Sequence, residues 1–128
     1  KEGCVAYTKA KKNVKGSVTI PATVTIDGVT YKVTSVAANA FKGNKKITKV
    51  TIGKYIEKIG KNAFYGCKKL SSITFKTTKL KASKVGKNAF KGVKAKVTVK
   101  VPKNKAKDYK KWLKKKGIPA NAKFKTAK

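Results

Sequence analysis

The sequence predicts a solenoid of mainly β structure, in which each stacked coil contributes one short strand and short helical turns. The triplet Asn-Ala-Phe recurs, starting at positions 39, 62 and 88. A glycine follows each triplet, and alternating apolar residues come soon after it. Self-similarity with a period of roughly 20–30 residues is typical of coils that bury their apolar sides against one another.

The turn in the central copy shows why its residues recur. We expect Asn62 to cap a short helical turn, because its side chain can accept a hydrogen bond from a free backbone N–H. Phe64 would then fill the interior of the coil. Gly66 would end the turn at a positive φ that other residues resist.

The apolar residues after each turn predict one strand per coil. In the central copy, Ile73 and Phe75 point inward while Ser72 and Thr74 point outward, because side chains alternate along a strand. The equivalent inward residues are Ile47, Val50 and Ile52 in the first copy and Val97, Val99 and Val101 in the third. A second, shorter ladder of inward residues is predicted from Val33 and Val36, Ile56 and Ile59, and Leu80 and Val85.

The central copy matches the pattern Ile-Gly-x-x-Ala-Phe-x-x-Cys-x-x-Leu-x-x-Ile at Ile59, Gly60, Ala63, Phe64, Cys67, Leu70 and Ile73. This pattern resembles the BspA-type, or Treponema-type, leucine-rich repeat of bacterial surface proteins, over about residues 33–102. The first copy has Asn44 at the cysteine position, and the third has Val93 there and Lys96 at the leucine position. The resemblance implies a right-handed leucine-rich-repeat solenoid that serves as an extracellular binding, adhesion or display module on a bacterial surface.

The repeats define a predicted core and predicted boundaries. The repeat core is expected to contain Phe41, Phe64, Phe90, Cys67, Leu70 and Ile73. Since Cys67 lies at an inward position, a buried free thiol is favoured over a disulfide with Cys4. The chain is interpreted as one domain, with an antiparallel β cap over 1–32, three repeats over 33–102 and a helical cap with a tail over 103–128. The insertion between the second and third copies, residues 77–84, is expected to form a local loop.

Each predicted cap has its own signal. In the first, Asp27-Gly28 between alternating apolar residues predicts a β-hairpin, and residues 9–16 form a basic turn region. In the second, Asn104 is the expected N-cap of a helix. Its apolar face contains Ala106, Tyr109, Trp112 and Leu113. We favour packing of this face on the solenoid end, and the alternative is binding to a membrane surface. Gly117 suits the residue after the helix, and the tail either adds a strand with Phe124 inward or frays.

The charge is the most unusual feature of the composition. The 128 residues include 35 lysines and four acidic residues, with no arginine or histidine, for a formal net charge of +31. Such a charge favours acidic partners and opposes self-association, so we expect a monomer. Sequence-specific binding to nucleic acid is not expected, because base readout depends on arginine forks. A solvated, highly soluble surface is the favoured interpretation, and a polyanion site is the alternative.

No enzymatic chemistry is predicted. The chain has no histidine, its four acids are isolated, and Cys67 has no evident base beside it. No phosphate-binding glycine loop and no pair of cysteines at zinc-ligand spacing occurs, so neither a cofactor nor a metal is expected. There is no signal peptide or transmembrane run, and we expect the chain to be a fragment of a longer protein.

The candidate binding face is the outward side of the stacked strands. Its residues are Lys49, Thr51, Ser72, Thr74, Thr98 and Lys100. Hydroxyl and ammonium groups at strand spacing can bind sulfate, phosphate or carboxylate groups of an extended polymer. A simpler interpretation is that threonine and lysine are merely tolerated on an exposed sheet. The expected partners are a host or cell-surface protein or, alternatively, an anionic wall polymer, glycan or nucleic acid bound through charge alone.

Overall fold

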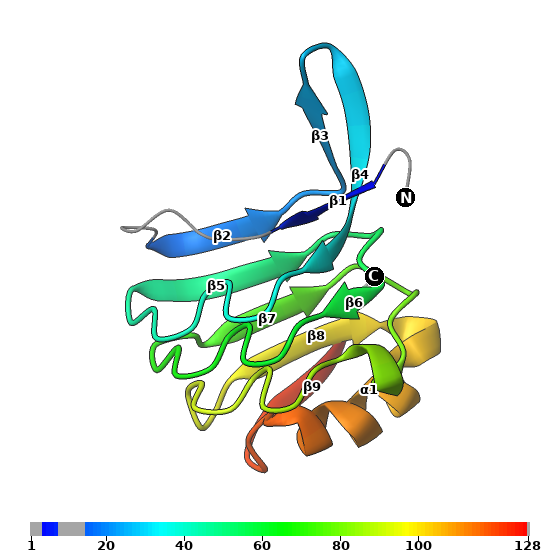
Figure 1. The fold of residues 1–128 in the computed structure, drawn as a ribbon. Helices are drawn as coiled ribbons and strands as arrows, with labels where there is room; N and C mark the ends of the chain where they lie inside the picture. Colours follow the sequence, from blue (N-terminus) through cyan, green and yellow to red (C-terminus); the bar gives the residue numbers. More distant parts are fainter. Residues whose placement is uncertain (1–3, 8–14, 128) are drawn as a thin grey trace.

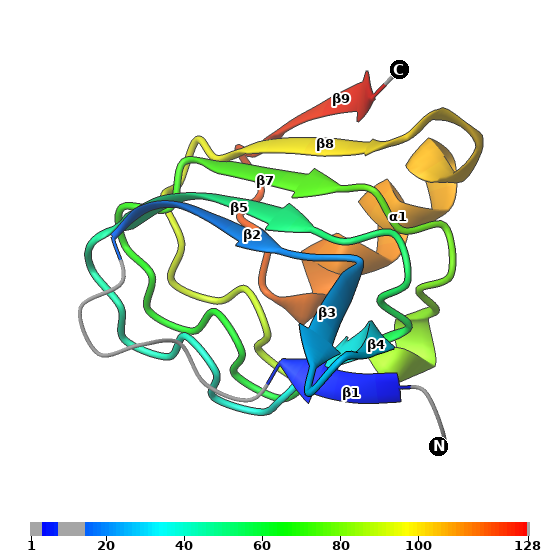
Figure 2. The ribbon, with the colours of Figure 1, turned by 90° about the horizontal axis from the view of Figure 1, so that it is seen from above.

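The computed structural model describes residues 4–7 and 15–127, which form stacked coils around one core (Figures 1 and 2). The larger sheet contains five parallel strands in the order β2-β5-β7-β8-β9. These strands are Gly16–Ile20 (β2), Ile47–Ile52 (β5), Ser72–Phe75 (β7), Thr98–Pro102 (β8) and Lys123–Ala127 (β9). The prediction of parallel strands, one from each repeat, is confirmed.

A smaller sheet lies on the other side of the core, as the view from above shows (Figure 2). Its strands are Cys4–Tyr7 (β1), Thr23–Ile26 (β3), Val29–Val36 (β4) and Lys58–Ile59 (β6). Val36 pairs with Ile59 in parallel, and Ile59 forms a parallel bridge with Val85. This is the second ladder that the sequence predicts.

The Asn-Ala-Phe turns are not helical, so the prediction that their asparagines act as helix caps is wrong. Asn39, Asn62 and Asn88 have φ values of 62°, 58° and 59°. A helix N-cap has extended backbone instead. Asparagine recurs because it is one of the few residues other than glycine that readily adopt the left-handed conformation. Gly66 does have the predicted positive φ, at 76°.

Backbone hydrogen bonds join each turn to the turn of the next coil. The Phe41 N–H donates to the Ala63 carbonyl and the Phe64 N–H donates to the Ala89 carbonyl, both at 2.7 Å. Close stacking requires a glycine before the turn. A Cβ atom on Gly60 would lie 2.3 Å from the backbone nitrogen of Ala38, and one on Gly86 would lie 2.3 Å from that of Lys61, in each case in the preceding coil. The glycine of the repeat is therefore needed for contact between coils.

The core is one continuous apolar cluster from Val18 to Ile118. Three phenylalanine rings stack along its axis, with centroid separations of 5.1 Å between Phe41 and Phe64 and 5.3 Å between Phe64 and Phe90. All six residues assigned to the repeat core are buried. Cys67 is a free thiol that donates a hydrogen bond to the Phe41 carbonyl at 3.2 Å.

The N-terminal segment differs from an antiparallel cap. Among the described strands, antiparallel pairing is confined to the β3–β4 hairpin, where Ile26 faces Val29 across the predicted Asp27-Gly28 turn. By contrast, β1 pairs with β4 in parallel and β2 pairs with β5 in parallel, so β2 continues the larger sheet. The strand β2 joins that sheet because it has the same alternation, with Val18 and Ile20 buried and Ser17 and Thr19 exposed. The hairpin projects from the stack (Figure 1). Most of the predicted basic turn over 9–16 lies outside the described residues.

The C-terminal helix α1, Ala106–Leu113, packs its apolar face on the core. Tyr109 and Leu113 are buried, and Ala106 and Trp112 are partly buried, which argues against the membrane-surface alternative. Asn104 is not the N-cap. It lies in the 3-10 turn η2, Lys103–Lys105, because the chain is already helical there, and Lys105 precedes α1 without a side-chain cap. No helix among the described residues has the length and apolar character needed to cross a membrane.

Two further 3-10 turns, η1 (Ala82–Lys84) and η3 (Lys114–Lys116), complete the helical elements. Gly117 follows η3 at a φ of 108°, in the left-handed conformation expected of a residue that ends a helix. The tail forms β9, in which Phe124 is half-buried against the core. Of the two alternatives for the tail, the added strand is the one observed.

The inserted loop is tied to the helix rather than independent of it. The Tyr109 hydroxyl donates to the Thr77 carbonyl at 2.9 Å and accepts from the Leu80 N–H at 3.3 Å. The Thr77 hydroxyl in turn donates to the Ile56 carbonyl at 2.5 Å, and Thr77 is fully buried. A loop with such buried polar anchors is a fixed part of the stack, because breaking those bonds would leave buried groups unpaired.

Candidate functional site

The outward side chains of the larger sheet form two rows that cross all five strands in register. The first row contains Ser17, Lys49, Ser72, Thr98 and Lys123. The second row contains Thr19, Thr51, Thr74, Lys100 and Lys125. The structure therefore brings together all six residues of the predicted face, and places three of them in each row.

Sequence reasoning missed the outer members of both rows. Ser17 and Thr19 belong to β2, which the antiparallel-cap interpretation assigned elsewhere, and Lys123 and Lys125 belong to the tail strand. The signal was present in each case as a polar residue on either side of an inward apolar residue. All four outer residues are exposed, whereas Thr51, Ser72, Thr74 and Thr98 are half-buried.

The rows present a regular array of hydrogen-bonding groups. Neighbouring strands lie about 4.8 Å apart, so a ligand lying across the sheet meets a polar group at each step. Serine and threonine hydroxyls both donate and accept, while lysine ammonium groups only donate. This arrangement suits reversible binding to polar or anionic groups, and it contains no general base.

A groove follows the edge at which the parallel strands end, and we call it the strand-end groove. One part has a volume of about 560 Å³, and its lining includes Lys54, Thr74, Lys76, Pro102 and Lys103. The adjoining part, of about 190 Å³, is lined by Thr19, Ile20, Pro21, Ala22, Thr51, Gly53, Lys54 and Lys76. Lys54 and Lys76 line both parts, so the two parts adjoin. Three threonines of the second row form one side of this groove.

A cluster of ammonium groups surrounds the Tyr55 ring and shares Lys54 with the groove. The Nζ atoms of Lys32, Lys54 and Lys79 lie 4.9, 5.2 and 6.0 Å from the centroid of the Tyr55 ring. These lysines come from β4, from the turn after β5 and from the inserted loop. The sequence could not reveal this cluster, because the three segments approach one another only when the coils stack.

The electrostatics of this side of the molecule are those of unpaired positive charge. Within the described part of the chain, no lysine forms an ion pair with a carboxylate. Asp27, Glu57 and Asp108 are far apart in the chain, and no group of three or more metal-binding side chains occurs among the described residues. Burial raises the pKa of the Cys67 thiol to about 12, so this group is protonated at neutral pH.

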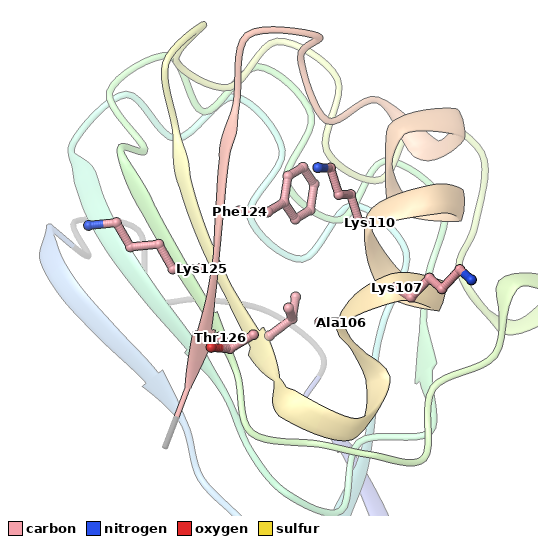
Figure 3. A pocket seen from close by; sticks show the side chains of 7 residues that line it. Ala106, Lys107, Lys110, Phe124, Lys125 and Thr126 are labelled. Atoms are coloured by element: carbon pink, nitrogen blue, oxygen red, sulfur yellow. The ribbon is translucent and has the colours of Figure 1, made fainter.

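A smaller pocket of about 250 Å³ lies between β9 and α1 (Figure 3). Phe124 points from β9 toward the helix, whereas Lys125 points away on the opposite side of the strand (Figure 3). The lining also includes Val101, Ala106, Lys107, Lys110, Lys125 and Thr126. Its apolar floor continues the core, so we interpret the pocket as the end of the packed interior.

Comparison with known proteins agrees with this architecture. The family model for the BspA type leucine rich repeat region matches residues 17–112 in six copies. A crystal structure of a leucine rich cell surface protein from Faecalibacterium prausnitzii A2-165 is similar, with 26% sequence identity and a TM-score of 0.50. That match covers 68% of this chain and 30% of the other, and no curated protein matches. The chain belongs to the BspA-type leucine-rich repeat family.

Proposed function

We propose that this domain is a non-catalytic binding or display module of a cell-surface protein, and that the outward face of the larger sheet is its binding surface. The observation that carries the proposal is the register of the two polar rows across five strands. The stacked backbone fixes this register, and it places hydroxyl and ammonium groups where one extended ligand can contact several strands at once. The description of the similar structure as a cell surface protein supports an extracellular location. Adhesion to a host or cell-surface protein is the specific role that we favour.

A second candidate is attachment of the parent protein to an anionic polymer through charge. The formal net charge of +31 favours it. Because charge at an exposed surface is screened by salt, this mode of binding would weaken steeply with ionic strength. Binding through a complementary hydrogen-bonded face would weaken less.

A binding array tests both candidates. It would contain host matrix proteins, neutral and acidic glycans and polyanions, probed at low and at physiological salt. We expect salt-tolerant binding to a defined partner, lost in the double variant Thr51→Ala/Thr74→Ala. The matched control is Thr25→Ala/Thr30→Ala, which removes two exposed hydroxyls from the projecting hairpin. Binding to every polyanion that disappears with salt would favour the second candidate, and the absence of any binding would contradict both.

We also propose that the coil is right-handed and that its 128 residues form one domain. A strand, a crossover and a parallel strand of the same sheet are almost always connected with right-handed topology. The single core cluster supports one domain. Helix α1 would then serve as the cap of the C-terminal end, since a solenoid must cover its terminal coils.

A further inference from the structure

We propose that the strand-end groove binds a polysaccharide that carries tetrahedral oxyanion esters, with Lys54 and Lys76 as the central contacts. These two lysines follow neighbouring strands, β5 and β7, and both line both parts of the groove. Lys103 follows the next strand, β8. Three successive strands therefore each contribute a lysine to the lining of the groove, just after the strand ends.

The lysine cluster at Tyr55 indicates the shape of the anion. Three ammonium groups lie within 6.0 Å of one ring centroid, with no carboxylate partner in the described part of the chain. Like charges this close to one ring raise the local positive potential, which attracts an anion. A sulfate or phosphate monoester has three terminal oxygens and a carboxylate has two, so the ester offers more acceptor sites to a group of ammonium donors.

The threonines and the floor of the groove indicate the polymer. The hydroxyls of Thr19, Thr51 and Thr74 both donate and accept, which matches the hydroxyl groups of sugars. Single-stranded nucleic acid would need exposed aromatic rings for its bases. Phe75 lines the groove but is fully buried, so its ring offers no face for stacking. A hydroxyl-rich polysaccharide is therefore the better fit.

This inference rests on the proposed binding role and shares Thr51 and Thr74 with it, but its test depends on Lys54 and Lys76. The role stands on the hydroxyl rows, and the inference stands on lysines at the strand ends. If the threonine variants lose a partner in the array while the lysine variants bind polysaccharide like the native chain, the groove proposal fails and the binding role remains. If the lysine variants lose polysaccharide binding while the threonine variants keep every partner in the array, the groove proposal stands and the role of the hydroxyl rows fails.

The experiment measures binding of the 128-residue chain to defined oligosaccharides at physiological salt. The probes are a heparin octasaccharide, its desulfated form, a phosphate-bearing oligosaccharide and single-stranded DNA of similar charge. The test variant is Lys54→Gln/Lys76→Gln. The control is Lys68→Gln/Lys94→Gln, which removes the same number of charges from exposed lysines that precede β7 and β8, at the opposite edge of the sheet. Because all four side chains extend from the surface, both variants are expected to melt like the native chain.

We expect the native chain to bind the sulfated or the phosphorylated probe and not the desulfated one. The test variant should lose about tenfold or more in affinity, and the control less than about threefold, since only the test pair makes charge-assisted hydrogen bonds. The bound probe shows whether sulfate or phosphate is preferred. Equal losses in the two variants, no binding to either ester, or equally tight DNA binding through the same lysines would each overturn the proposal.

Discussion

Replacing Phe64 with alanine tests the architecture most directly. The ring is fully buried and stacks between Phe41 and Phe90, with interplanar angles of 7° and 6°. Burial of a phenylalanine removes roughly 150–200 Å² from water, which corresponds to about 4–5 kcal/mol at ~25 cal/mol per Å². Alanine retains part of this area, but the stacked rings cannot fully collapse into the cavity. We therefore expect a loss of about 3–5 kcal/mol in the free energy of unfolding.

The assay is thermal and urea unfolding, followed by circular dichroism. At about 3–5 °C per kcal/mol for a domain of this size, the variant should melt roughly 10–20 °C below the native chain. Tyr65→Ala is the control, because Tyr65 is the next residue in the same turn but is 37% exposed. Its loss should stay below about 1 kcal/mol. Equal destabilisation by the two substitutions, or an unchanged midpoint for the phenylalanine variant, would refute the stacked core.

Three other predictions follow from contacts between coils. Tyr109→Phe should lower the free energy of unfolding by about 1–3 kcal/mol and speed hydrogen exchange in the inserted loop. The buried Thr77 carbonyl and Leu80 N–H would lose the tyrosine hydroxyl to which they are hydrogen-bonded. Exchange in that loop at the rate of the native chain would contradict the anchor. Gly60→Ala should destabilise the chain more than Gly43→Ala. A Cβ at Gly60 would meet backbone at 2.3 Å, whereas a Cβ at Gly43 meets nothing within 4 Å and adds only the strain of a φ of 74°, about 1–2 kcal/mol. Equal losses of unfolding free energy in the two variants, measured by calorimetry, would contradict this reasoning. In a Cys4→Ser background, the Cys67 thiol should resist alkylation until the chain unfolds, and rapid labelling of the native chain would disprove its burial. The free energy of unfolding should also fall as pH rises above about 9, because the thiol ionises there only in the unfolded chain, while its pKa in the folded chain is about 12.

The repeat itself was readable from sequence because periodicity reports burial. Ile73 and Phe75 alternate with polar neighbours, and the same alternation recurs in each copy. Burial of one face of a strand fixes which residues point outward, so the rows of the candidate face could be predicted with it. The glycine and asparagine positions were also visible, although the reason for asparagine was not. Left-handed backbone and helix capping favour the same residue type, and only the dihedral angle distinguishes them.

Features that depend on how coils approach one another could not be predicted. The pairing of β2 with β5 required knowledge of which strand lies at the edge of the stack, and sequence favoured the hairpin signal at Asp27-Gly28 nearby. The cluster around Tyr55 joins β4, a turn and an inserted loop, none of which belongs to the repeated pattern. The anchor between Tyr109 and the loop likewise spans more than thirty residues of sequence, with no local signal at either end.

The division between stabilising and free positions explains why a chain with so much lysine can still fold. Backbone hydrogen bonds and apolar stacking hold the coils together, and neither involves the outward side chains. Thr77 illustrates the contrast, because it is buried and its hydroxyl is used inside the stack, whereas Thr51 and Thr74 face outward from neighbouring strands. Substituting the outward threonines should therefore leave stability nearly unchanged. Any change in binding at those positions then reports on recognition rather than on folding, which makes the sheet face and its groove the places where the function of this domain can be measured.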